Sequence, residues 1–461
     1  MSDCLPVSLF RPFSADEPAM PASWHPEEKG HDRAQIAAMS LAVRNAVAND
    51  GRTSWVVADE NAALFLAGLL GVLAAGGRVI MPQHTGRDAV LAHADAETGV
   101  VSSASALTEV GALDPTRLPT TEGEAHDLRI APDASLTLFT SGSTGEPKRI
   151  DKAVRQLDVE VQLLERLWGK QLGQSRIVAT VPHHHLYGLL FRLLWPFQSG
   201  RLFPELALLE PPRIVAACAN ADSSVLVSSP AHLKRWPGFA ALHGPSVQLA
   251  VIFSSAGPLP AETSQALHQS LDPVSVWEVY GSTETGGIAW RDQGAPGFSH
   301  WHPFEGVELD LPAGEPGRLS VRSAVCGGEW MDTGDRAEIV GDAFRLLGRD
   351  DGVIKIEDRR VSLDEIEQAL EASEWIAEAA VLRLDGERQT TAAALVLTAT
   401  GRQALEAAGN WRFRGELRAL LAERFTEVVL PRRFRYLDRL PRNAMGKLQR
   451  RELLALFERA S

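Results

Sequence analysis

The chain has 461 residues, of which 45% are hydrophobic and 23% charged; this is ordinary for a globular protein and long enough for more than one domain. A net charge of −13 argues against a nucleic-acid partner, because phosphate contacts need a basic face. Three widely separated cysteines without C-x-x-C spacing point to a reducing compartment and to no structural metal.

The first part of the chain predicts an α/β fold. Its first residues lack the basic and apolar regions of a signal peptide, and the uncharged run over 62–77 is shorter than the ~20 residues of a membrane span. We therefore expect a cytoplasmic protein with no membrane span. Hydrophobic periodicity predicts a helix over His31–Asn49, a strand over Ser54–Ala58, a helix over Ala62–Ala75 and a strand over Arg78–Pro82. A strand, a helix and a strand with short connections predict a parallel sheet flanked by helices.

A polar loop follows the apolar run Leu136–Phe139. Residues 140–148 read Thr-Ser-Gly-Ser-Thr-Gly-Glu-Pro-Lys. The glycines permit a tight turn whose N–H groups approach a ligand, while the hydroxyls and Lys148 add donors and a cation. This set suits the phosphates of a nucleotide, although a plain surface turn is the alternative. The spacing differs from that of a Walker A loop, which disfavours a P-loop kinase.

A histidine-rich segment comes next, after a predicted helix over 152–169 and a predicted strand over Arg176–Val181. Residues 182–188 read Pro-His-His-His-Leu-Tyr-Gly. Consecutive side chains project in different directions and no ligand partner follows at metal-binding spacing, so a metal site is disfavoured. The alternative is a polar strand end with one histidine pointing inward.

Further motifs follow along the chain. Predicted strands over Leu226–Ser229 and Leu249–Ser254 precede a small turn at 255–257, and residues 280–284 read Tyr-Gly-Ser-Thr-Glu. A β-rich section contains Thr-Gly-Asp at 333–335 and leads to Gly-Arg-Asp-Asp-Gly-Val-Ile-Lys at 348–355. Later elements are predicted helices over Leu363–Ala372 and near Gly415–Phe425, and predicted strands near Ala379–Leu384 and Ala392–Leu397. The last motif, at 440–450, reads Leu-Pro-Arg-Asn-Ala-Met-Gly-Lys-Leu-Gln-Arg.

In this order, these motifs resemble those of the adenylate-forming (AMP-binding) superfamily, which includes acyl-CoA and aryl-CoA synthetases. The resemblance covers roughly residues 52–453. It implies a large N-terminal adenylation domain over 1–349, with parallel-rich sheets, flanking helices and a β-rich section. It also implies a hinge at Asp351 and a small mobile α/β domain over 350–461.

The resemblance also implies a role for each motif. The implied catalytic residues are Lys447, Thr283, Glu284 and His185. The implied nucleotide-binding residues are Thr140, Ser141, Gly142, Ser143, Thr144, Gly145, Lys148, Ser255, Ala256, Gly257, Tyr280, Gly281, Thr283, Asp335 and Arg349. Glu284 and Thr140 are expected to hold Mg²⁺, a hard cation that prefers oxygen ligands. His185, Tyr187, Gly257 and Trp277 are expected to border the acyl pocket.

The implied reaction is the ATP-dependent activation of a carboxylic acid to acyl-AMP, with release of pyrophosphate, followed by transfer to a thiol of CoA or phosphopantetheine. An enzyme that stops at acyl-AMP would share these motifs. A non-catalytic nucleotide-binding protein would be expected to lack one of Lys148, Glu284, Asp335 or Lys447, and all four are present. One departure concerns the acceptor: Asp358 stands where the family has a glycine beside the pantetheine.

Substrate and acceptor are predicted from fewer residues. Members of this family that activate amino acids place an acidic residue near the position of His185 to hold the substrate ammonium; this chain has His, Leu and Tyr there, so the resemblance argues against an amino-acid substrate. Tyr187 and Trp277 favour a compact aromatic acid such as a hydroxybenzoate; a medium-chain fatty acid is the second choice, and both aromatics could instead belong to the core. The segment 431–451 is strongly basic, which suggests a landing surface for an acidic acyl carrier protein, or else a solvated face paired with the acidic residues 364–378.

Overall fold

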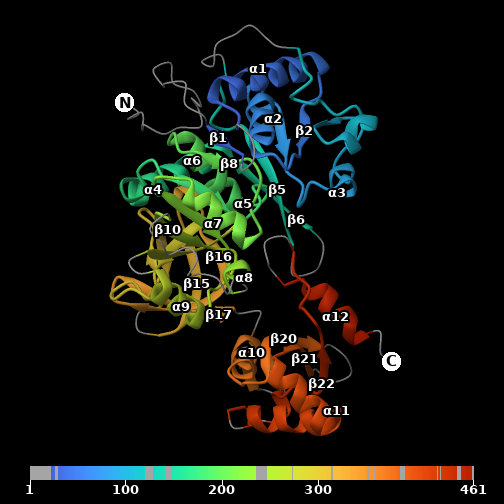
Figure 1. The fold of residues 1–461 in the computed structure, drawn as a ribbon, viewed down its shortest axis with the longest axis vertical. Coiled ribbons are helices and arrows are strands. Elements are labelled where there is room, and N and C mark those ends of the chain that lie inside the picture. The colour runs from blue at the N-terminus through green and yellow to red at the C-terminus, as the bar shows by residue number, and fades with distance from the viewer. Residues whose placement is uncertain are drawn as a thin grey trace. The chain divides into compact units, whose positions relative to one another are not determined.

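The computed structural model describes residues 22–25, 30–119, 128–141, 147–234, 247–271, 274–312, 315–349, 353–356, 359–384, 390–422, 424–425, 427–443 and 448–458. The fold is mixed α/β, as predicted (Figure 1). The chain divides into two compact units, Met1–Glu308 with Val321–Met331, and Leu309–Ser320 with Asp332–Ser461. Among the described residues, none of the helices has the length and apolar character that a membrane crossing requires.

The first sheet of the larger unit has five strands in the order β4-β2-β3-β5-β6. Strands β2 (Ser54–Val57), β3 (Arg78–Ile80), β4 (Thr98–Val101) and β5 (Ser135–Ser141) are parallel, and β6 (Pro147–Ala153) is antiparallel to β5. Helices α1 (Arg33–Asp50) and α2 (Ala62–Ala74) pack against each other (Figure 1). Every residue of α2 up to Leu73 is buried, which explains its uncharged sequence.

The second sheet has six strands in the order β13-β12-β11-β10-β9-β7. Strands β7 (Arg176–Ala179), β9 (Ser224–Ser228), β10 (Leu249–Ser254) and β11 (Ser275–Ser282) are parallel; β12 (Gly286–Arg291) and β13 (His302–Pro303) are antiparallel. The carboxyl ends of the four parallel strands lie at one edge of the sheet, which is where ligands bind in open α/β sheets.

Helices cover both faces of this second sheet. Ile252 and Val276 share a core with residues of α7 (Pro211–Ala219), α8 (Pro230–Lys234) and α9 (Ala261–Leu271). Their sequence neighbours point to the other face, where Phe253 lies with its ring 4.9 Å from that of Trp168 in α4 (Val154–Leu172). This alternation is the two-residue period of a strand buried on both sides.

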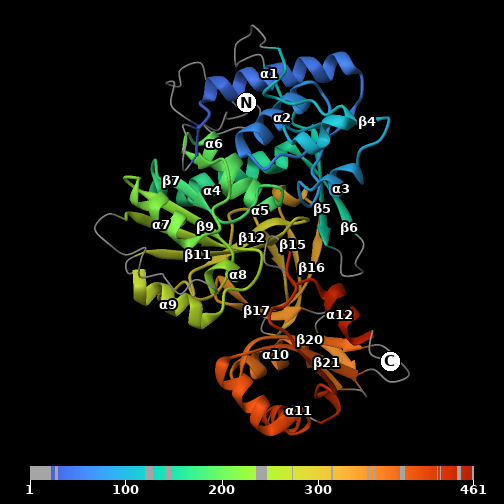
Figure 2. The same ribbon diagram turned by 45° about the vertical axis from the view of Figure 1, so that its right-hand side comes forward.

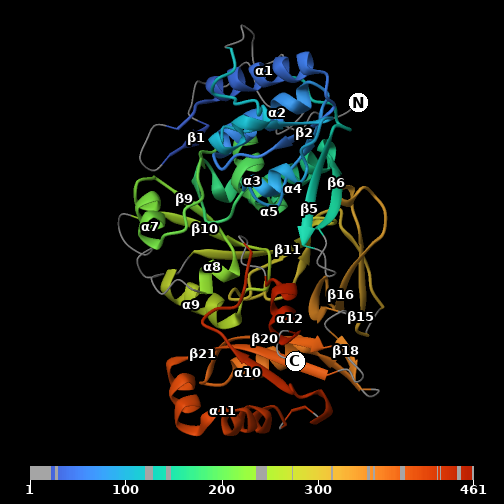
Figure 3. The same ribbon diagram turned by 90° about the vertical axis from the view of Figure 1, so that its right-hand side faces the viewer.

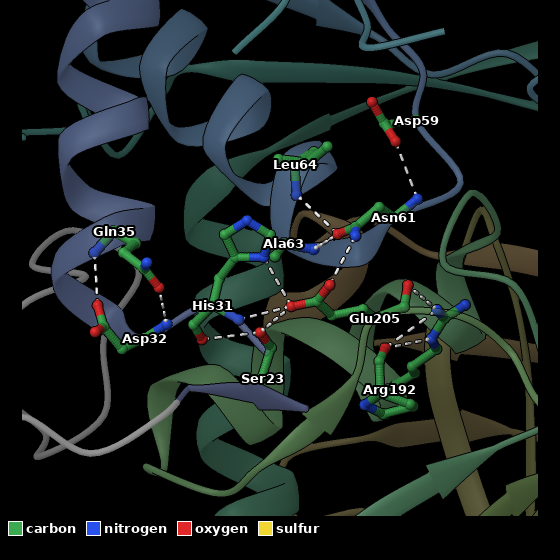
Figure 4. Close-up of polar contacts among 11 residues, drawn as sticks. Ser23, His31, Asp32, Gln35, Asp59, Asn61, Ala63, Leu64, Arg192 and Glu205 are labelled. Carbon is green, nitrogen blue, oxygen red and sulfur yellow. Dashed lines mark hydrogen bonds and ion pairs between the residues drawn. The ribbon is translucent and has the colours of Figure 1, made fainter. Parts of the chain in front are cut away.

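A buried carboxylate connects the N-terminal segment to the rest of the larger unit (Figure 4). Glu205 follows β8 (Phe203–Pro204), and its Oε1 accepts from Ser23 Oγ at 2.8 Å and from the N–H of His31 at 2.7 Å. The ring Nδ1 of His31 also lies 2.8 Å from Oε1, and Asn61 Nδ2 donates to Oε2 at 2.7 Å. Burial opposes the charged form, but these bonds outweigh it and lower the pKa of Glu205 to about 2. The hydrogen bond to Glu205 raises the pKa of His31.

The smaller unit contains a three-stranded sheet in the order β20-β21-β22, formed by β20 (Ile376–Leu384), β21 (Thr390–Leu397) and β22 (Arg433–Tyr436). Helices α10 (Leu363–Glu371) and α11 (Ala399–Ala422) cover one face, and α12 (Arg450–Glu458) covers the other (Figure 2). Ala379 and Val381 belong to the first core, whereas Ala380 and Leu382 belong to the second.

Two glutamates of α10 cover the outer edge of β20. The N–H of Ala379 donates to Glu371 Oε1 at 2.9 Å, and the N–H of Val381 donates to Glu367 Oε1 at 2.7 Å. The two carboxylates are four residues apart and therefore lie on one face of the helix, facing alternate N–H groups of the strand. Burial raises the pKa of Glu367 to about 7.

Apart from the parallel pair of β1 (Ser23–Trp24) and β8, the remaining described strands form two further sheets. One has the order β14-β15-β16-β17, formed by β14 (Glu308–Asp310), β15 (Gly317–Arg322), β16 (Met331–Val340) and β17 (Ala343–Arg349). The other pairs β18 (Val353–Ile356) with β19 (Arg359–Ser362). Shorter elements are β1 (Ser23–Trp24), α3 (Arg87–Leu91), α5 (Leu186–Gly188), η3 (Leu189–Leu194), α6 (Trp195–Gln198) and the 3₁₀ turns at Ser105–Val110, Ala324–Cys326 and Glu427–Val429.

Three expectations need correction. The helix predicted from residue 152 begins at Val154, because 147–153 pair with β5 as strand β6. The helix predicted near Gly415–Phe425 is part of α11, which begins at Ala399 and is interrupted by Gly409 with φ 75°. The polar strand end considered for the histidine segment is instead the start of α5, which runs on into η3.

Candidate active site

The two strongest motifs meet in the structure although they are far apart in the sequence. Lys148 lies on β6 opposite Thr140 of β5, and Glu284 lies in the turn between β11 and β12. Figure 3 shows the β5–β6 hairpin. The Nζ atom of Lys148 is 3.0 Å from Glu284 Oε1. Partial burial disfavours the charged carboxylate, but the hydrogen bond from Lys148 helps to hold the pKa of Glu284 below its ordinary value. An ionised carboxylate therefore lies beside a cation at the end of the β5–β6 hairpin.

The turn that carries Glu284 is tightly built. The side chain of Thr285 accepts from the N–H of Ser282 at 3.0 Å and donates to Gly286 O at 2.8 Å. At Gly281 a Cβ would lie 2.2 Å from Gly286 O, and Gly286 itself has φ +68°, so both positions require glycine. Thr283 is half-buried in this turn. The ring of Tyr280, the residue expected against adenine, packs 5.5 Å from that of Trp301.

The three histidines occupy different environments. The Nε2 atom of buried His183 lies 2.9 Å from Asp59 O. Burial, with Arg192 nearby, holds the pKa of His183 well below its usual value, and burial lowers the pKa of His184 to about 3. His185 is half-buried immediately before α5. Within the described part of the chain, no group of three His, Cys, Asp or Glu side chains could hold a metal ion.

Gly188 fixes the course of this segment. A Cβ at Gly188 would lie 1.9 Å from Pro182 O, a main-chain atom that cannot rotate away. Tyr187 lies in this segment, between Pro182 and Gly188. Its ring is 4.9 Å from that of Phe191, and its hydroxyl is buried without a hydrogen bond of normal geometry among the described residues. Burial raises the pKa of Tyr187 well above its usual value, so the phenol is neutral.

The small turn after β10 is strained. Ala256 has φ 74° and is the one non-glycine residue in the described chain with a positive φ. The buried Ser255 hydroxyl donates to Val279 O at 2.7 Å and ties the turn to β11, while nothing lies within 4 Å of a Cβ placed on Gly257. Trp277, by contrast, joins an aromatic cluster, with its indole 6.2 Å from Trp168 and 5.2 Å from Trp290.

In the smaller unit, the expected ribose residues lie opposite each other. Asp335 on β16 is in register with Arg349 on β17, and Oδ1 and Nη1 are 3.7 Å apart. Gly334 has φ +73°, and its N–H donates to Asp332 at 2.8 Å. A carboxylate has two oxygens and can accept hydrogen bonds from two hydroxyls.

Some predicted residues cannot be placed. Residues 142–146, 350–352, 357–358 and 444–447 lie outside the described structure, and so does the side chain of Ser141. These ranges include Gly142, Ser143, Thr144, Gly145, Asp351, Asp358 and Lys447. Their roles remain predictions.

The structure also brings in residues that the sequence did not single out. Lys152 is 2% exposed and donates from Nζ to Glu284 O at 3.2 Å and to Val325 O at 3.4 Å. Glu160 of α4 is 4% exposed and accepts from the N–H of Gly287 at 2.7 Å. Burial lowers the pKa of Lys152 and raises the pKa of Glu160, and their mutual attraction opposes both shifts. The sequence feature that could have revealed Lys152 is its spacing of four residues from Lys148, which puts both side chains on one face of a strand.

Comparison with known proteins identifies the family to which the chain is similar. Residues 31–325 match the family model of AMP-binding enzymes, and residues 365–447 match the AMP-binding enzyme C-terminal domain. The chain is 30% identical over 324 residues to a 4-coumarate–CoA ligase of Cereibacter sphaeroides, which covers 70% of this chain and 72% of that one. It is 26% identical over 411 residues to a 4-chlorobenzoate–CoA ligase of Arthrobacter sp, covering 81% and 75%.

A carrier-protein ligase and a solved structure are also similar. The chain is 22% identical over 355 residues to a D-alanine–D-alanyl carrier protein ligase of Staphylococcus aureus, covering 70% of this chain and 71% of that one. The crystal structure of ATP-bound MatB from Rhodopseudomonas palustris aligns with a TM-score of 0.76 and 20% identity, covering 97% of this chain and 98% of that one. The structural likeness shows a shared fold.

Proposed function

Since the chain belongs to the AMP-binding enzyme family and is an AMP-forming acid–thiol ligase, we propose that it activates an aromatic acid such as a hydroxybenzoate and passes the acyl group to a carrier-protein thiol. In the first half-reaction, a carboxylate oxygen of the acid attacks the α-phosphorus of ATP, and pyrophosphate leaves. In the second, the thiolate sulfur attacks the acyl carbonyl carbon, and AMP leaves. The balance is acid, ATP and thiol converted to thioester, AMP and pyrophosphate.

The contact between Lys148 and Glu284 carries this proposal. It brings together a cation beside the polar loop and an ionised carboxylate from the second motif, 3.0 Å apart. Phosphoryl transfer depends on positioning and on stabilising negative charge rather than on covalent work by the protein. Lys148 would stabilise charge on the phosphates, and Thr283 would donate its hydroxyl to the α-phosphate.

Magnesium fits the residues present. The ionised Glu284 offers hard oxygen donors, and Thr140, in register with Lys148 at the end of the hairpin, offers a hydroxyl. When bound, the ion would neutralise charge on the phosphate oxygens. We propose that Asp335 and Arg349 hold the ribose hydroxyls and Tyr280 the adenine, and that Lys447 neutralises charge at the α-phosphate while the acyl-AMP forms.

Two observations favour an aromatic acid. The chain's relatives include enzymes named for 4-coumarate and 4-chlorobenzoate. In this chain Tyr187 packs against Phe191, and its buried hydroxyl has no hydrogen bond of normal geometry among the described residues, which leaves it a candidate partner for a polar ring substituent. Trp277 contributes less to this argument, because its indole packs within the Trp168 cluster. A medium-chain fatty acid is the alternative substrate.

A pyrophosphate-exchange assay over a panel of carboxylic acids tests the substrate. We expect the highest rates with hydroxybenzoates, lower rates with unsubstituted benzoate, and little exchange with decanoate. Exchange that is faster with decanoate than with every benzoate would favour the fatty-acid alternative. Mass spectrometry of the products distinguishes a thioester-forming ligase from an enzyme that stops at acyl-AMP.

The arginines of the basic segment 431–451 have different structural roles, and only some of them are candidates for contact with the acceptor. Arg433 and Arg435 donate to the carbonyls of Phe457 and Leu456 at the end of α12, at 3.0 and 3.3 Å, so they help to hold this helix. Arg432 and Arg439 are exposed. We propose that they contact an acidic carrier protein, since complementary charge steers such partners.

Charge reversal tests the acceptor. Arg432→Glu with Arg439→Glu should slow transfer to a holo carrier protein at sub-saturating concentration and leave pyrophosphate exchange unchanged. The control is Arg129→Glu with Arg155→Glu, which reverses two exposed arginines of the larger unit. Faster turnover of the wild type with CoA than with the carrier, or unchanged carrier kinetics in the Arg432/Arg439 variant, would rule out a carrier preference.

A further inference from the structure

Strand β6 holds Glu284 through two lysines. Lys148 and Lys152 are four residues apart on the strand and therefore project from the same face. The side chain of Lys148 is 60% exposed and contacts the carboxylate of Glu284, whereas Lys152 is 2% exposed and donates to the main-chain oxygen of the same residue. One strand thus contacts the expected metal ligand at both its side chain and its backbone.

Lys152 is a buried cation whose hydrogen-bond partners are main-chain carbonyls. Its Nζ atom donates to Glu284 O at 3.2 Å and to Val325 O at 3.4 Å, and Gln156 Nε2 donates to the same Val325 oxygen at 3.0 Å. A buried ammonium group is costly, and an apolar side chain of similar size often serves stability as well or better. Stability alone therefore does not explain a lysine here.

Glu160, which attracts Lys152 electrostatically, holds the other side of the same turn. Glu160 Oε1 accepts from the N–H of Gly287, three residues after Glu284. A Cβ at Gly286 would lie 2.2 Å from Val325 and 2.8 Å from Glu160 Oε2, so the turn packs closely on both groups. The buried pair thus fixes the main chain at residues 284 and 287.

We propose that Lys152 is a positioning residue for Glu284, which fixes the main chain of this turn so that the carboxylate is directed for Mg²⁺ and the triphosphate. This inference depends on the proposed role of Glu284 in adenylation. Lys152 is too deeply buried to contact the nucleotide, so its effect is transmitted through the Glu284 carbonyl. Loss of the lysine should impair adenylation. Acyl transfer from preformed acyl-AMP, which releases no pyrophosphate, should not change.

The test is Lys152→Met, which removes the charge and keeps the length of the side chain. Removing a group that orients a metal ligand typically costs 10–100-fold in metal affinity or activity. We expect the Mg²⁺ concentration for half-maximal pyrophosphate exchange to rise at least about tenfold, and transfer from supplied acyl-AMP to keep its wild-type rate. Lys170→Met, which removes an exposed lysine of α4, is the matched control and should change neither.

A second variant keeps the proposal testable if Lys152→Met does not fold, because Glu160 would then be buried without its counter-charge. Lys152→Met with Glu160→Leu removes both charges and should fold, yet still require more Mg²⁺. Wild-type Mg²⁺ dependence in either folded variant would overturn the proposal, as would an equal loss of both half-reactions. No exchange by the wild-type enzyme with any acid would instead contradict the proposed function itself.

Discussion

Replacing Glu205 by glutamine should remove one of the larger single contributions to the stability of the unit that contains it. Its carboxylate accepts from Ser23, from Asn61 and from the N–H of His31 at 2.7–2.8 Å, and its side chain is 5% exposed. Lowering the pKa of Glu205 from 4.5 to about 2 means that the fold stabilises the ionised carboxylate over the protonated form by about 3 kcal/mol, since one pKa unit corresponds to about 1.4 kcal/mol. We expect Glu205→Gln to lower the free energy of unfolding by about this amount at pH 7.

The lowered pKa of Glu205 also predicts how the stability difference between wild type and variant changes with pH. A lowered folded-state pKa adds stability above the unfolded-state value near 4.5 and loses it as the pH falls toward 2, so the difference between wild type and variant should shrink over that range. Urea denaturation at pH 7 and at successively lower pH measures it. Glu97→Gln, an exposed glutamate, is the control and should stay within about 0.5 kcal/mol of wild type. A Glu205→Gln variant as stable as this control would refute the argument.

Three further outcomes are expected. Because the pKa of His31 is raised in the fold, the free energy of unfolding lost in His31→Gln should be largest below pH 6.5 and should disappear as the pH rises through the folded-state pKa. Urea denaturation at pH 6 and at pH 9 measures this loss, and a loss that grew with pH would contradict the prediction. Lys447→Ala should abolish pyrophosphate exchange but leave transfer from supplied acyl-AMP largely intact, and wild-type exchange would exclude its catalytic role. Gly188→Ala should lower stability by about 1–3 kcal/mol, because its Cβ would overlap Pro182 O; an unchanged melting temperature would show that the segment can shift.

Much of the fold could be predicted because its signals are local. The strand at Leu249–Ser254 was predicted with its observed ends, and the apolar run that begins at Ala62 is the buried helix α2. Periodicity records which face of an element is buried, and that information lies within a few residues. It fails where a local feature breaks the pattern, as at Gly409 in α11, and where a strand such as β6 carries mostly polar residues.

The candidate site could be predicted only as separate motifs. That Lys148 and Glu284 belong to one site followed from the resemblance, but their 3.0 Å contact joins residues 136 apart in the chain. Lys152 could not be singled out, because its burial depends on Val325 and Glu284, which reach it only through the fold. The same holds for Glu205, whose partners come from three distant segments.

The glutamates of α10 have a consequence for the behaviour of the protein in concentrated solution. An edge strand of a sheet normally has unpaired N–H groups that can bond to the backbone of another extended chain, and this pairing is a common route to aggregation. On β20, the N–H groups of Ala379 and Val381 already donate to Glu371 and Glu367. An incoming strand would have to displace both carboxylates from these N–H groups. The helix thus opposes edge-to-edge association along this part of β20, just beyond the register shift that the strand has between Ile376 and Glu378.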